Sequence, residues 1–163
     1  KTFAYVTVSR IVAVNTLQAI AESVTSEASP EINRLHVVSD AQREQLFMSD
    51  FSRTDTGFWE SSGPINIVDC DQWLKSAADQ ASSAFSTVGP GLTKLVDDLP
   101  ESIGCLPEEM WTPRASNVAA IAERLAADNQ FADPFELEPF YLRKSSAEEK
   151  RDAKLAAEAA NQN

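Results

Sequence analysis

The chain has 163 residues, 43% of them apolar, and a formal net charge of −11. This length and composition are typical of one globular domain with its own core, and the acidity excludes autonomous binding to nucleic acid, which relies on clustered Lys and Arg. Apolar runs far shorter than the roughly 18–20 residues of a membrane span, and the lack of a signal-peptide pattern, predict a cytoplasmic protein without a membrane partner.

The chain opens on the end of a helix. Residues 1–9 carry Phe3 and Val6 on one side, and no N-cap residue stands in front of them. This leads us to expect that the element begins upstream of residue 1. Residues 10–14, rich in β-branched side chains, then predict a short strand.

An amphipathic helix is predicted next. Asn15 or Thr16 serves as its N-cap, and Pro30 lies beyond its expected end near Glu27. Its apolar stripe has helical spacing and consists of Leu17, Ile20, Ala21 and Val24.

Residues 35–51 predict a β-hairpin around which the rest of the chain is organised. Two nearly continuous apolar runs, 35–38 and 46–51, flank the polar corner 40–44. Strands of this kind are covered on both faces. We therefore expect helices above and below the hairpin, and the hairpin itself at the centre of the sheet.

The middle of the chain alternates short strands and helices. Strands are predicted over 58–61 and 65–68, followed by a helix that Asp69 or Asp71 caps. Residues 78–86 are expected to be a surface connection. A brief strand entering a glycine turn, a short helix and a loop follow over 87–92, 93–99 and 100–107.

The last predicted core element is a helix. Thr112 is its expected N-cap and Pro113 its first residue, with an apolar stripe made of Val118, Ile121, Ala122 and Leu125. Residues 131–143 predict an extended segment pinned by aromatic side chains. Residues 144–163 are expected to be a charged, Ala-rich helix or a disordered tail.

The titratable side chains do not assemble a recognisable catalytic motif. His36 is the only histidine and falls in a predicted strand, where it is either a structural residue or a base or ligand. Cys70 and Cys105 lack the spacing of a metal or redox motif and are expected to be free thiols.

Two short motifs remain open to alternative interpretations. Residues 89–91, Gly-Pro-Gly, fit either a plain turn or the remnant of a phosphate-facing loop. Asp69 and Asp71 could either cap the following helix or bind a hard cation. By residue chemistry alone, the chain is a mixed α/β domain for which we predict no catalytic residue, no cofactor and no metal.

Several segments taken together resemble the TsaB family, the accessory subunit of bacterial tRNA threonylcarbamoyladenosine synthesis. Residues 11–21 are similar to the family's V-x-T-L-x-A-x-A helix, and residues 38–47 to its D-A-R-x-x-E-V-Y hairpin. Residues 88–91 resemble its glycine turn, and residues 137–143 its closing E-P-x-Y-L-R. The resemblance covers residues 1–143 in order and spacing.

The chain departs from the family in three respects. Val8 stands where the family tends to have Gly, and Gln42 stands near its usual Arg. The family also begins with a lobe that has no counterpart here, ending in a G-P-G-S-F-T-G loop and a helix within which Lys1 is expected to fall. The resemblance is therefore to the second lobe of such a protein, with the stub of the inter-lobe helix.

The resemblance implies the α/β fold of the actin, Hsp70 and sugar-kinase group, with a ribonuclease H-like lobe whose mixed sheet is flanked by helices. It implies a non-catalytic subunit that pairs with TsaD, with the ATPase TsaE in the same complex, and Phe3 and Val6 as the surviving partner contacts. A homodimer through the apolar surface that the missing first lobe would cover is a further expectation. The alternatives are an ATPase or glycoprotease-like enzyme of this fold and a stand-alone acidic interaction module.

Overall fold

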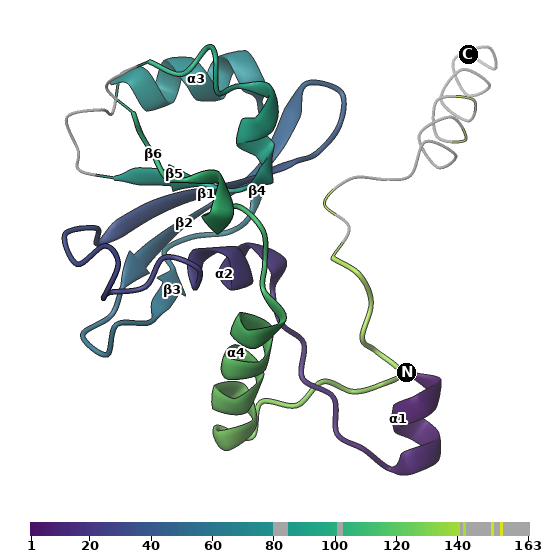
Figure 1. Ribbon diagram of the computed structural model, residues 1–163. Coiled ribbons are helices and arrows are strands. Elements are labelled where there is room, and N and C mark those ends of the chain that lie inside the picture. Colours follow the sequence, from purple (N-terminus) through teal and green to yellow (C-terminus); the bar gives the residue numbers. More distant parts are fainter. Residues whose placement is uncertain (80–84, 101–102, 141, 143–150, 152–153, 155–163) are drawn as a thin grey trace.

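The computed structural model describes residues 1–79, 85–100, 103–140, 142, 151 and 154, and in this part it has a six-stranded mixed sheet with helices on both faces (Figure 1). The predicted α/β class, a mixed sheet flanked by helices, is confirmed. The strands are β1 (Arg34–Asp40), β2 (Gln45–Arg53), β3 (Trp59–Ser61), β4 (Asn66–Asp69), β5 (Ser86–Val88) and β6 (Gly104–Cys105). The helices are α1 (Thr2–Thr7), α2 (Thr16–Ala21), α3 (Cys70–Asp79) and α4 (Ala115–Ala127), with 3₁₀ turns η1 (Pro90–Lys94) and η2 (Glu108–Met110).

The β1–β2 hairpin lies at the centre of the sheet, as predicted. The order is β3-β2-β1-β5-β6, with β4 also paired to β2. β1 runs antiparallel to β2, with Leu35 opposite Phe51, and parallel to β5. Val37 and Val38 point to opposite faces, and both are fully buried. Figure 1 shows why: α3 covers one face of the sheet and α2 the other.

Helix α2 begins as the sequence predicts but is shorter than expected. Asn15 is the N-cap, and its side chain accepts the Leu17 N–H at 2.8 Å. The expected end near Glu27 is wrong, because the helix ends at Ala21. The Val24 carbonyl, which a longer helix would bond internally, accepts the indole N–H of Trp59 at 2.8 Å instead.

A predicted strand and the predicted start of the last helix are wrong. Residues 10–14 do not form a strand; within the described residues Ile11 alone pairs, in an isolated bridge with Ala132. Thr112 is not the N-cap of α4, which starts at Ala115 after Arg114. The Thr112 carbonyl instead accepts the Ser23 hydroxyl at 3.5 Å, a tertiary contact that local patterns do not encode.

The segment after β5 also differs from its prediction. The helix predicted over 93–99 is replaced by η1, since the Leu92 and Leu95 amides donate to carbonyls three residues back. The loop predicted over 100–107 contains β6, which pairs with β5. The connection predicted over 78–86 lies largely outside the described residues, as does nearly all of the predicted tail, 144–163.

Candidate functional site

The first candidate is a group of exposed apolar side chains on α1 and at its C-cap, here called the α1 surface and defined by Phe3, Tyr5, Val6 and Val8. These side chains are 66–89% exposed, whereas Ala4 is buried. Tyr5 contacts the ring of Phe135 edge-on at 5.6 Å between centroids. Figure 1 shows α1 standing apart from the sheet, beside the segment that follows α4. Such a group of exposed apolar side chains is a feature of interaction sites.

The two residues predicted to bind a partner, Phe3 and Val6, both lie on the α1 surface. Tyr5 and Val8 were not predicted, because the helical spacing that selects Phe3 and Val6 leaves them off the stripe. Val8 ends α1 in the left-handed conformation, with φ 55° and ψ 31°. A β-branched residue is strained there and Gly is the usual choice. Val at this position therefore lowers the stability of the folded chain.

The polar corner of the hairpin is a second candidate. Gln42, Arg43 and Glu44 are three consecutive residues with positive φ, between 53° and 63°. Asp40 supports them: its carboxylate accepts the Gln42 N–H at 2.8 Å and the Lys94 ammonium at 2.7 Å. The hydrogen bond from Lys94 lowers the pKa of Asp40. The Asp40 carboxylate is thus engaged on both sides, so its observed role is to support the turn.

The two open motifs both have structural explanations. Gly89 has φ 128°, and a Cβ on it would lie 2.1 Å from the Val38 carbonyl oxygen, so residues 89–91 form a turn packed tightly beneath β1. The Asp69 carboxylate accepts the Asp71 N–H at 3.2 Å at the start of α3. Among the described residues, no cluster of three or more His, Cys, Asp or Glu could hold a metal ion.

His36 lies at a cavity of about 150 Å³ under α3, together with Asp50, Trp73 and Ser76. Its Nε2 is 3.3 Å from an Asp50 carboxylate oxygen, and its ring stacks on Phe85 at 3.8 Å. Its Nδ1 has no hydrogen-bond partner within the described residues. The side chain is 8% exposed, and this burial lowers the pKa of His36 despite the nearby Asp50. The imidazole is therefore a neutral packing group at neutral pH.

Acid should weaken the fold through His36. Because its pKa is lowered in the folded state, the unfolded chain binds more protons. The free energy of unfolding should therefore fall as the pH drops below about 6.5, the ordinary histidine pKa. Urea denaturation of the wild-type chain and of His36→Gln, at about pH 7.5 and about pH 5, measures this.

The acid-dependent loss of stability should be smaller in His36→Gln than in the wild type. Asp50 and Arg34, whose charges act on the imidazole, are present in both proteins, so the comparison isolates His36. An equal loss in the two proteins would contradict the assignment.

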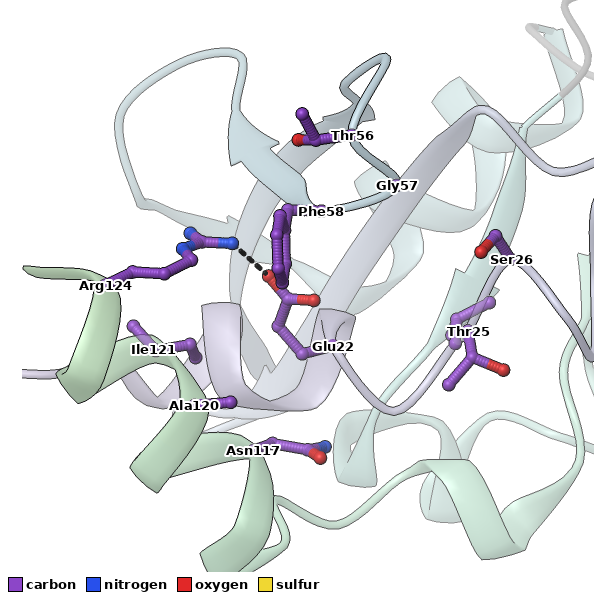
Figure 2. A pocket seen from close by; sticks show the side chains of 11 residues that line it. Glu22, Thr25, Ser26, Thr56, Gly57, Phe58, Asn117, Ala120, Ile121 and Arg124 are labelled. Atoms are coloured by element: carbon purple, nitrogen blue, oxygen red, sulfur yellow. Dashed lines mark hydrogen bonds and ion pairs between the residues drawn. The ribbon is translucent and has the colours of Figure 1, made fainter.

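The third candidate is a cavity of about 290 Å³ between the end of α2, the β2–β3 turn and α4 (Figure 2). Glu22, which is 13% exposed, meets Arg124 at 3.5 Å. The same carboxylate oxygen accepts the Trp59 backbone N–H at 3.2 Å. The Arg124 guanidinium lies 4.0 Å from the centroid of the Phe58 ring. Burial raises the pKa of Glu22, and the hydrogen bond from Trp59 and the charge of Arg124 partly offset this effect.

Sequence reasoning missed this cavity. Glu22 and Arg124 are 102 residues apart. Glu22 directly follows α2 and Arg124 lies on α4, and in the sequence both look like ordinary solvent-exposed residues. No local pattern connects them, so only the packing of α4 beside α2 could have revealed the pair. Helices in the described ranges also lack the combined length and apolarity of a membrane-crossing segment.

Two solved structures from Pseudomonas aeruginosa share the fold of this chain. One, described as an uncharacterized protein with similarity to peptidase YEAZ, has a TM-score of 0.69 at 18% identity over 87% of this chain and 63% of its own. YeaZ itself has a TM-score of 0.68 at 16% identity over 86% of this chain and 64% of its own. The chain thus spans less than two thirds of either structure. No protein-family model and no curated protein matches the sequence.

These similarities confirm the predicted fold. YeaZ proteins are the TsaB family, and both structures superpose on most of this chain. At 16–18% identity this likeness shows a shared fold.

Proposed function

We propose that the chain is a non-catalytic accessory subunit in the threonylcarbamoyl modification of adenosine beside the tRNA anticodon. It would act in the cytoplasm by pairing with a TsaD-like subunit, in a complex that also contains a TsaE-like ATPase. The likeness to YeaZ supports this proposal through the fold, and the sequence segments that resemble TsaB support it independently.

The α1 surface is the observation that carries the proposal. Phe3 is 78% and Val6 73% exposed. A partner that covers apolar side chains of this kind gains about 25 cal/mol for each Å² removed from water. Aromatic residues are enriched at the centres of protein interfaces. The α1 surface therefore has the chemistry of a protein contact, which an accessory subunit needs and a stand-alone enzyme does not.

An enzyme of the same fold is the second candidate, since one neighbour is described by its similarity to a peptidase. Ser76, His36 and Asp50 border one cavity, which are the residue types of a nucleophile, a base and an orienting acid. However, no hydrogen bond joins Ser76 to His36 within the described residues, and His36 Nδ1 is buried without a partner. This geometry favours the accessory role over a hydrolase.

Reconstitution tests the proposed function. Purified TsaD-like and TsaE-like subunits, with tRNA, ATP and a pre-activated threonylcarbamoyl donor, are assayed for the modified nucleoside by mass spectrometry, with and without this chain. We expect modification only when the chain is present, and no hydrolysis of ATP or of a peptide substrate by the chain alone. Modification that is independent of the chain would contradict the proposal, and hydrolysis lost in Ser76→Ala would favour the enzyme.

A further inference from the structure

We propose that the cavity beside Glu22, Phe58 and Arg124 binds a free α-amino acid in its zwitterionic form. The inference rests on the described cavity alone and is independent of the α1 surface and of the proposed function. The cavity of about 290 Å³ lies just below the usual range for drug-sized ligands, about 300–1,000 Å³. One small ligand would fill it.

Glu22 supplies half of the recognition. Both of its hydrogen bonds, from the Trp59 amide and from Arg124, fall on one oxygen, Oε1. Within the described residues, Oε2 receives none. Figure 2 shows that Oε2 points away from Arg124, toward the side where Thr25 and Ser26 lie. A carboxylate that is only 13% exposed and half satisfied gains from an added donor, and from a charged donor most of all.

Arg124 supplies the other half. A guanidinium carries five N–H donors, yet in the described part of the chain the Arg124 side chain makes a single hydrogen bond, the one to Glu22 at 3.5 Å. The Phe58 ring, 4.0 Å away, holds the guanidinium plane in place. The side chain is 30% exposed, so its remaining donors can reach a carboxylate that enters the cavity.

An α-amino acid carries the complement of both halves on one carbon. Its ammonium can donate to Glu22 Oε2 while its carboxylate accepts from Arg124, so the ion pair is completed and no charge is left over. A ligand with only a cation or only an anion satisfies one side and leaves a net charge in a partly buried site. The side chain of the amino acid would face Phe58 and the hydroxyl groups of Thr25, Ser26 and Thr56.

Calorimetric titration of the whole chain distinguishes these cases with three probes of nearly the same shape. L-valine carries both groups, L-valinamide lacks the carboxylate, and 3-methylbutanoate lacks the ammonium. We expect L-valine to bind and each of the other two to bind at least about ten-fold more weakly, as is typical when one charged hydrogen bond is lost. Equal binding of all three, or no binding of L-valine up to about 10 mM, would overturn the proposal.

Variants test the two residues. Glu22→Gln and Arg124→Gln should each weaken L-valine binding at least about ten-fold, whereas Glu123→Gln, on the same helix but bordering a different groove, should not change it. Should either variant fail to fold, amide resonances of the wild type decide: L-valine should shift those of Gly57, Phe58 and residues 120–124. Binding with shifts only elsewhere, or unaffected by folded Glu22→Gln, would refute the site.

Discussion

Gly89→Ala should abolish stable folding of the chain or lower its free energy of unfolding by more than about 3 kcal/mol. The new Cβ would lie 2.1 Å from the Val38 carbonyl oxygen, which is backbone of the central strand and cannot move aside. In addition, φ at this position is 128°, a conformation that residues with a Cβ rarely adopt. The steric clash and the backbone strain both destabilise the folded state, and their costs add.

Gly63→Ala is the matched control. Nothing lies within 4 Å of the position that its Cβ would occupy, so the same chemical change should alter stability by less than about 1 kcal/mol. Urea denaturation followed by circular dichroism measures both variants. Equal stability of the two would show that the turn after β5 does not pack beneath β1 as described.

Trp59→Ala should cost about 3–5 kcal/mol of stability, the usual range for removing a buried aromatic side chain. The ring is fully buried, its indole N–H caps the Val24 carbonyl at 2.8 Å, and the Arg53 guanidinium lies 4.3 Å from the ring centroid. The variant removes the hydrogen-bond partner of the Val24 carbonyl as well as the apolar volume, so the segment after α2 and the sheet both lose a contact.

The neighbouring aromatic residue is the control for Trp59. Phe58 is 38% exposed, and Phe58→Ala should cost less than half as much, because less apolar area is lost from contact with the protein. Thermal unfolding of the two variants ranks them. A greater loss in Phe58→Ala than in Trp59→Ala would contradict the core arrangement.

Local patterns predicted the centre of the fold and failed at its edges, for a physical reason. β1 is buried on both faces over residues 35–38, and the apolar run of β2 lies beside it, so the two runs identify a central hairpin without reference to the rest of the chain. Asn15 likewise caps α2 through a neighbour two residues away. By contrast, the Thr112 and Val24 carbonyls accept hydrogen bonds from Ser23 and Trp59. These partners are distant in sequence, so no local pattern contains the contacts.

The candidate sites divide in the same way. Phe3 and Val6 could be selected because helical spacing places them on one side and the resemblance to TsaB gave that side a role. The cavity of Glu22 and Arg124 has no sequence signal, since its walls come from three separated segments. The His36 pocket was half predicted: its strand was found, but its stacking on Phe85 depends on how β5 joins the sheet.

Affinity for a purified TsaD-like subunit tests the central claim most directly. Isothermal titration compares the wild-type chain with the double variant Phe3→Asp, Val6→Asp and with Val96→Asp, a control at another exposed apolar residue. We expect the double variant to bind at least about 30-fold more weakly with unchanged stability, and Val96→Asp to bind like the wild type. Undiminished binding by the double variant, or no binding by the wild type, would contradict an accessory subunit that pairs through the α1 surface.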